Sequence, residues 1–207
     1  MRPFFWIAMV AGCYPLMTTP LEAQLFFVGV RAGAGIPTGS FAEAAQGAAS
    51  DGLVRGAKPG LGYGLDAGVG LGPVGLYVGT DRIQFDCQPQ SCAASGKYKL
   101  TGVSAGLRMG IPLFPIVKPW VKAGIAVNEL TGTFSGASSG TTVTTERRPG
   151  YELGAGVDVP VMGFFSITPQ VRYVSQKLRY NFPGTSGGSR GVEYYTFDLG
   201  FRFRSPI

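Results

Sequence analysis

The stretch that decides the fold is Leu61-Gly-Tyr63-Gly-Leu65-Asp-Ala67-Gly-Val69-Gly-Leu71, in which every odd position is apolar and every even position is Gly or Asp. Successive side chains of a β-strand point to opposite faces, so this period of two predicts a strand with one apolar face. No segment after residue 23 shows the 3.6-residue apolar period of a helix of any length. The chain is therefore expected to be all-β.

Seven other segments alternate in the same way, with varying regularity. In one of them the apolar positions shift parity, from Val74, Leu76 and Val78 to Ile83 and Phe85. This shift indicates either a bulge or an exit of the strand from the buried zone. The eight predicted strands span residues 26–36, 61–71, 74–85, 101–111, 121–127, 151–159, 167–173 and 195–203.

The composition indicates that the apolar faces meet lipid. The 207 residues include 33 Gly, and only 14% are charged, whereas an average soluble domain has about 25% charged residues. A soluble barrel turns its apolar face inward and needs many charges outside, but the second face here is mostly Gly with about one charge per strand. In lipid, only helices and closed barrels satisfy all backbone polar groups. A barrel that spans a membrane is the prediction.

The connections between these strands alternate in length. Short turns at 72–73, 112–116 and 160–163 alternate with long polar segments at 37–59, 87–96, 131–149 and 178–192. An even number of strands with this alternation is typical of bacterial transmembrane barrels, whose short turns face the periplasm. The predicted fold class is an eight-stranded, antiparallel, up-and-down transmembrane β-barrel.

The first 23 residues are interpreted as a secretory signal peptide, and residues 24–207 as the barrel domain. Arg2 precedes a short apolar segment at 4–11, and small Ala23 offers a cleavage site. Eight apolar residues are too few for a membrane anchor, which needs about 20. The sequence around Cys13 also resembles a lipobox, so lipidation there is the alternative.

After export and removal of the signal peptide, two cysteines remain in the chain. Cys87 and Cys92 flank a polar turn in an oxidising compartment, which predicts a disulfide across a small loop. The sequence has no His and no further Cys after residue 92, so no metal site is expected.

Two segments resemble the small outer-membrane β-barrel family, which includes the transmembrane domain of outer membrane protein A and OmpX. They are Val28-Gly-Val-Arg-Ala-Gly-Ala-Gly-Ile-Pro-Thr-Gly39 and Phe197-Asp-Leu-Gly-Phe-Arg-Phe203. The resemblance implies location in the bacterial outer membrane of a Gram-negative cell after Sec-type export. It also implies that the barrel-assembly machinery reads an aromatic near the last strand residue. Phe203, with Phe201, fits that place, although the trailing Arg204-Ser-Pro-Ile207 departs from the usual terminal Phe.

If the apolar faces point to lipid, the opposite faces line the lumen. An eight-stranded barrel is just wide enough for side chains to fill it, and buried charges persist only when paired. We therefore expect an ion-pair network that plugs the barrel. The expected lumen charges are Arg31, Asp66, Arg108, Lys122, Glu152, Asp158, Arg172, Asp198 and Arg202.

The expected function is structural and non-catalytic, with no cofactor and no nucleic-acid partner. Some small outer-membrane barrels are acyl-transfer enzymes that use a His base, and this chain has none.

Outer-membrane lipid is the expected surrounding, and the protein is expected to be a monomer. The alternatives are a surface adhesin, a binder of lipopolysaccharide or a host factor, and a small diffusion channel. The basic residues in the predicted loops, which suit lipopolysaccharide or a merely solvated surface, are Arg55, Lys58, Lys97, Arg147, Arg148, Arg179 and Arg190.

Overall fold

A computed structural model describes residues 26–43, 55–88, 95–112, 116–135, 140–182 and 185–205. The predicted signal peptide, Cys13 and Cys92 lie outside these ranges. The elements are β1 (Phe27–Thr38), α1 (Gly39–Ala42), β2 (Gly60–Leu71), β3 (Val74–Asp86), β4 (Ser95–Gly110), β5 (Lys118–Ser135), β6 (Gly140–Thr144), β7 (Arg148–Met162), β8 (Phe165–Phe182) and β9 (Thr185–Arg204).

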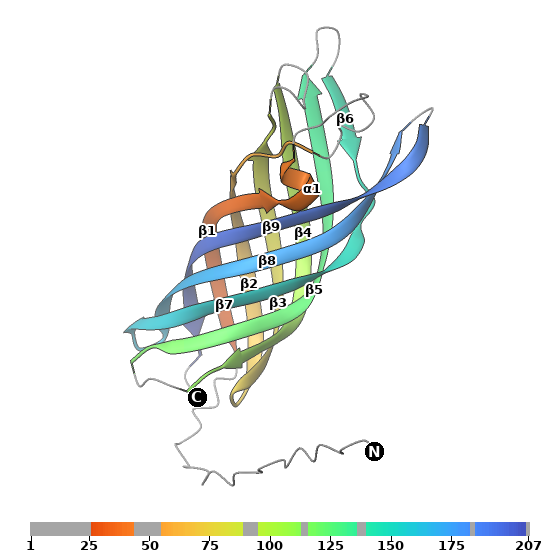
Figure 1. The fold of residues 1–207 in the computed structure, drawn as a ribbon. Coiled ribbons are helices and arrows are strands. Elements are labelled where there is room, and N and C mark those ends of the chain that lie inside the picture. Colours follow the sequence, from red (N-terminus) through yellow and green to blue (C-terminus); the bar gives the residue numbers. More distant parts are fainter. Residues whose placement is uncertain are drawn as a thin grey trace, which may run out of the picture.

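Eight of these strands close into a barrel (Figure 1). Each of the eight pairs antiparallel with its neighbour in the chain, apart from the short β6, and β1 pairs with β9 to complete the circle. Strand β6 pairs with β5 above the point where β5 and β7 separate. The predicted fold class is confirmed.

The two ends of the barrel differ. The turn end holds the turns at 72–73 and 163–164, the start of β1 and the end of β9. The loop end holds α1, β6, the end of β8 and the start of β9 (Figure 1). No helix in the described part of the chain is both long and apolar enough to cross a membrane.

The strands are longer at the loop end than the sequence predicts. Strands β8 and β9 pair from Phe165 with Phe203 up to Phe182 with Thr185, so most of the predicted loop at 178–192 is a hairpin. In the same way β5 continues into the predicted loop at 131–149, and β4 begins inside the predicted loop at 87–96. These loop boundaries were wrong because the apolar-outside alternation stops where the outer face of a strand leaves the lipid, although the backbone pairing continues.

The outer face of the barrel carries the apolar band that a lipid-facing surface requires. The alternation predicted for β2 places Leu65 outward and Asp66 inward, and the other strands follow it. Large outward-facing residues are Val30, Leu65, Leu76, Val78, Val103, Leu107, Ile125, Leu153, Phe197, Leu199 and Phe201.

The parity shift in β3 is not a bulge. Exposed and buried positions alternate without a break from Val74 to Asp86, and the pairing with β2 and β4 has no register shift. Ile83 and Phe85 lie on the same inward face as Asp81. The strand therefore leaves the lipid zone, which was the other prediction, and the lumen changes from polar to apolar at that level.

Inward-facing glycines leave space beside the neighbouring strands for large side chains. A Cβ on Gly33 of β1 would lie 2.0 Å from the carbonyl oxygen of Phe197 and 2.7 Å from a carboxylate oxygen of Asp198. Real Cβ atoms do not approach other atoms so closely. The Gly-rich second face of the sequence thus leaves room for the large charged side chains that share the lumen.

Candidate functional site in the barrel lumen

Asp81 is the centre of the charge network in the middle of the lumen. Arg172 Nη1 and Nη2 each donate to this carboxylate over 2.9 Å, and Arg31 Nη2 donates to it over 2.8 Å. Arg31 also pairs with Asp66, while Arg172 Nε donates to Asp198 over 2.9 Å. These five residues come from five different strands, so charge-assisted hydrogen bonds join the barrel wall across its interior.

A second ion pair extends this network toward β5 and β7. Lys122 pairs with Glu152, which is fully buried, and Arg172 Nη1 lies 3.8 Å from the same carboxylate. The Lys122 ammonium also lies 4.7 Å from the centre of the Tyr77 ring. Because each buried charge has an oppositely charged partner, the network offsets the cost of removing these groups from water.

A separate cluster surrounds Asp158 near the turn end. Its carboxylate accepts hydrogen bonds from Arg108 and Arg202, each over 2.5 Å, and from Arg204. Trp120 Nε1 donates to Asp158 over 3.0 Å, and Thr168 Oγ1 donates over 2.9 Å. Three guanidinium groups thus share a single carboxylate.

The structure places all nine lumen charges named from the sequence inside the barrel, each in at least one ion pair. It adds two that the sequence analysis missed, Asp81 and Arg204. Strict alternation along β3 puts Asp81 on the inward face, but the possible bulge obscured that position. Arg204 has the same parity as Arg202, but it follows residue 203, where the predicted strand ends.

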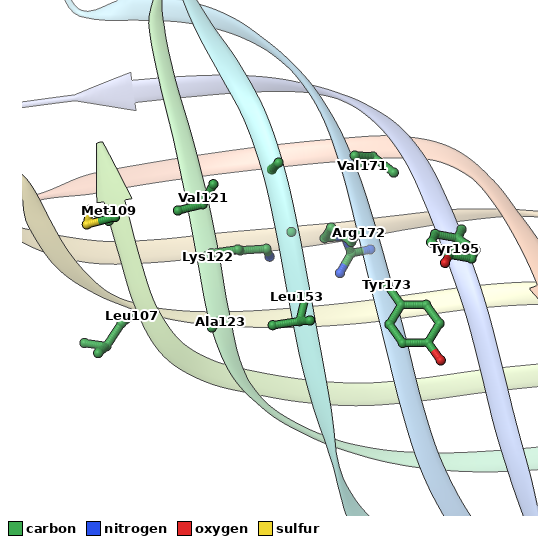
Figure 2. A pocket seen from close by; sticks show the side chains of 12 residues that line it. Leu107, Met109, Val121, Lys122, Ala123, Leu153, Val171, Arg172, Tyr173 and Tyr195 are labelled. Carbon is green, nitrogen blue, oxygen red and sulfur yellow. The ribbon is translucent and has the colours of Figure 1, made fainter. Parts of the chain in front are cut away.

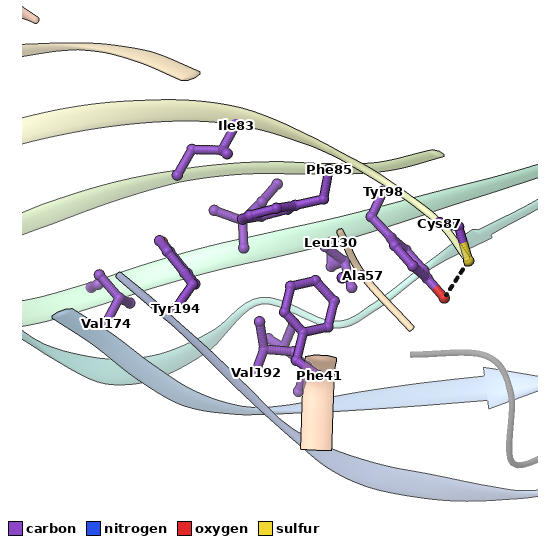
Figure 3. Packing of buried hydrophobic residues seen from close by; sticks show 13 residues of the cluster. Phe41, Ala57, Ile83, Phe85, Cys87, Tyr98, Leu130, Val174, Val192 and Tyr194 are labelled. Carbon is purple, nitrogen blue, oxygen red and sulfur yellow. Dashed lines mark hydrogen bonds between the residues drawn. The ribbon is translucent and has the colours of Figure 1, made fainter. Parts of the chain in front are cut away.

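An apolar cluster fills the lumen above the network, toward the loop end (Figure 3). We call it the outer cluster. Phe41, on the short helix α1, packs edge-on against Phe85 with ring centroids 5.3 Å apart, and Phe85 packs against Tyr194 at 5.7 Å. The outer cluster consists of Phe41, Ala57, Ile83, Phe85, Cys87, Tyr98, Leu100, Ala126, Leu130, Val174, Leu178, Val192 and Tyr194.

Cys87 lies at the edge of the outer cluster. Its Sγ is 3.8 Å from Tyr98 Oη, and that hydroxyl donates to the carbonyl oxygen of Arg55 over 2.9 Å. Cys92 lies outside the described residues, so the disulfide between the two stays a prediction.

The middle of the lumen offers little room for a ligand. A cavity bordered by Asp66, Lys122 and Gln170 measures about 10 Å³, which is about one probe sphere of water. Among the described residues there is no group of three or more Cys, Asp or Glu side chains that could hold a metal ion. The arrangement is that of a packed interior whose carboxylates are occupied by arginine and lysine.

The outside of the barrel carries a shallow groove of about 570 Å³ across β4, β5, β7, β8 and β9 (Figure 2). Ala123 and Ala155 form part of its floor between larger side chains such as Leu153 and Tyr173. The Tyr173 and Tyr195 rings lie beside each other with centroids 4.9 Å apart. The groove belongs to the apolar band, and the hydrocarbon chains of a bilayer are its ordinary covering.

The two aromatics predicted as an assembly signal lie on β9 near the turn end. Phe201 points outward and is 58% exposed. The Phe203 ring packs 5.4 Å from that of Phe165 and 5.9 Å from that of Phe164. Their role in assembly stays a prediction.

Three solved structures of outer membrane proteins have a similar fold. Neisserial surface protein A is 17% identical, with a TM-score of 0.60 over 87% of this chain and 97% of that one. Outer membrane protein AlkL is 14% identical, with a TM-score of 0.53 over 100% of this chain and 98% of that one. A major outer membrane protein of Thermus thermophilus is 15% identical, with a TM-score of 0.52 over 87% of this chain and 99% of that one.

No curated protein sequence matches this chain significantly. The sequence model of the outer membrane protein beta-barrel domain matches residues 9–204, which is nearly the whole chain. Together with the closed barrel and its apolar outer band, this match locates the protein in the bacterial outer membrane. The chain belongs to the outer membrane protein beta-barrel domain family.

Proposed function

We propose that this protein is a non-catalytic outer-membrane barrel with a closed lumen, and that it holds the extended strands and loops of its loop end at the cell surface. The observation that carries the proposal is the double filling of the lumen. The ion pairs around Asp81 occupy its middle, and the outer cluster occupies the part above. A pore would need a continuous polar path, and the outer cluster interrupts it.

The chemistry of the side chains supports the non-catalytic part of the proposal. The chain has no His, so the His-dependent acyl-transfer mechanisms of some outer-membrane barrels lack their base. The lumen carboxylates are engaged with arginine and lysine, as Asp81 is with Arg31 and Arg172. The elongated β8–β9 hairpin supports the surface role because its paired strands extend beyond the apolar band.

Conductance measurement tests the closed lumen. The purified wild-type protein is expected to insert into a planar lipid bilayer without stable current steps, because two layers of side chains block the path. A general porin inserted under the same conditions serves as the positive control, and the heat-dependent gel migration of the sample verifies that the barrel is folded. Frequent, stable single-channel steps from the wild type would contradict the proposal.

The second candidate function is lipopolysaccharide binding on the outer wall. A groove of about 660 Å³ spans β1 to β4 near the loop end. Ala32, Ala34 and Leu61 line its apolar part, and Arg82 and Lys97 line its polar part. Asp86 also lines the groove, which leaves one net positive charge among its charged side chains. Apolar surface beside cations suits an acyl chain joined to an anionic head group.

Substitution of these two outward-facing cations tests this candidate. Arg82→Gln with Lys97→Gln is expected to weaken lipopolysaccharide binding about tenfold, because charge-assisted contacts to phosphate are lost. Surface plasmon resonance on the immobilised, folded protein measures the affinity. The matched control is Arg147→Gln with Arg148→Gln, which removes the same charge from exposed positions on another side of the loop end. Equal affinity of the two double variants would remove lipopolysaccharide binding at this groove from consideration.

A further inference from the structure

The Asp158 cluster has more positive charge than its carboxylate balances. Arg108, Arg202 and Arg204 all pair with Asp158, and Asp66, another carboxylate near this part of the lumen, is paired with Arg31. Elsewhere in the described lumen, three cations face four carboxylates, so the positive excess is confined to the turn end. The turn end therefore holds an excess of two positive charges in a mostly buried place, and an excess of this kind attracts an anion.

The guanidinium groups also have unused donors. The Nε atoms of Arg108, Arg202 and Arg204 are buried, and none has a hydrogen-bond partner among the described residues. Buried polar groups in native proteins are almost always hydrogen-bonded. Guanidinium forks match the oxygen atoms of phosphate, so these donors suit a ligand that brings several oxygens.

Aromatic rings hold two of the three guanidinium groups, those of Arg108 and Arg202, in place. The Arg108 guanidinium lies 4.4 Å from the centre of the Trp120 ring, and the Arg202 guanidinium lies 4.9 Å from that of Phe27. Stacking of this kind fixes the plane of a guanidinium and leaves its edge available for hydrogen bonds. The site is therefore preorganised, which lowers the entropy cost of binding.

A cavity opens onto this cluster. It measures about 280 Å³, and Arg108, Arg204, Asp158 and Trp120 line it together with the turn at 72–73. Lys118 adds a further cation to its lining. Its other lining residues are mostly apolar or Gly, including Val74, Ile111, Pro112 and Pro119.

We propose that the cavity at the turn end binds a phosphate group, which Arg108 and Arg204 contact while Lys118 adds attraction at its rim. This inference goes beyond the proposed function, because the ligand enters from the end of the barrel opposite the loops. The phosphate belongs either to a free phosphate ion or to the head group of an anionic phospholipid. The shared chemistry is the phosphate, and the test distinguishes the two sources.

Trp120 provides a direct signal for binding. The chain has two tryptophans, and the other, Trp6, lies in the predicted signal peptide. The protein is purified from outer membranes into a neutral glycoside detergent and titrated with inorganic phosphate at constant ionic strength. A saturable change in Trp120 fluorescence is expected with phosphate and not with chloride.

A second titration identifies the source. Phosphatidylglycerol, or a neutral diacylglycerol with the same chains, is added to the micelles at equal mole fraction. If a phospholipid head group is the ligand, phosphatidylglycerol alone changes the fluorescence and then prevents the effect of free phosphate. If free phosphate is the ligand, phosphatidylglycerol acts no differently from the neutral lipid. In either case the phosphate site is supported.

Variants that remove a positive or a negative charge from the site test which residues bind phosphate. Arg108→Gln and Arg204→Gln are each expected to weaken phosphate binding about tenfold, whereas Arg147→Gln at the loop end leaves it unchanged. Asp158→Asn removes the competing carboxylate, so phosphate should bind more tightly and raise the melting temperature of this variant more than that of the wild type. The titration of the wild-type protein tests the proposal even if a variant fails to fold. A fluorescence response no larger than that to chloride, or unchanged affinity in folded Arg108→Gln, would overturn the proposal.

Discussion

Asp81→Asn is expected to lower the free energy of unfolding by about 3 kcal/mol, because removal of one partner of a buried ion pair leaves the other uncompensated. Asp81 accepts three hydrogen bonds from Arg31 and Arg172. The neutral amide keeps the shape of the side chain and removes its charge. Arg172 still contacts Asp198, and Arg31 still contacts Asp66, so the expected loss lies at the low end of the range for buried pairs.

Urea unfolding of the folded barrel in detergent, followed by gel migration of unheated samples, measures this loss. The matched control is Asp86→Asn, which makes the same change on the same strand at an exposed, outward-facing position. We expect the control to change stability by less than about 0.5 kcal/mol. Equal stability of the two variants would show that the central network does not hold the strands together.

Phe85→Ala is expected to cost about 3–5 kcal/mol, the usual range for truncation of a buried aromatic. The Phe85 side chain is fully buried and packs against both Phe41 and Tyr194. Its loss leaves a cavity between α1 and the barrel wall, which the paired strands cannot collapse to fill. Thermal unfolding and proteolysis of the segment around α1 should both report the change.

Phe197→Ala is the control for the outer cluster. Phe197 points outward and is 55% exposed, so truncation exposes its neighbours to detergent or lipid and creates no enclosed cavity. A smaller loss of stability than in Phe85→Ala is expected, with no change in proteolysis near α1. If α1 is as resistant to proteolysis in Phe85→Ala as in the wild type, the outer cluster does not anchor the helix.

Alternation of side chains predicted the barrel and the inward face of its strands, because a period of two is a local property of the backbone. The alternation predicted that Arg31 and Asp198 are lumen charges, but it did not predict their ion-pair partners. The partners depend on the stagger of strands around the barrel: Arg172 reaches Asp81 across 91 positions of sequence, and no local pattern encodes that meeting.

The outer cluster was missed for a different reason. The lipid-facing pattern assigns apolar residues to the outside, but beyond the bilayer the outside of a strand meets water and the apolar residues turn inward, as Ile83 and Phe85 do. The prediction applied one rule to the whole strand, whereas β3 passes from one solvent to another. Phe41 could not be placed at all, since a four-residue helix has no apolar period.

The pairing of β1 with β9 has a kinetic consequence. The closing seam joins Phe27 to Arg204, so its contacts have the greatest separation along the chain. Such contacts carry the largest loop-closure entropy and slow folding. The strands cannot close into a circle while the final strand is still being synthesised or exported, and the open sheet has two unpaired edges until then. Protection of those edges before closure is therefore a requirement that the topology places on the cell, independent of what the finished barrel does.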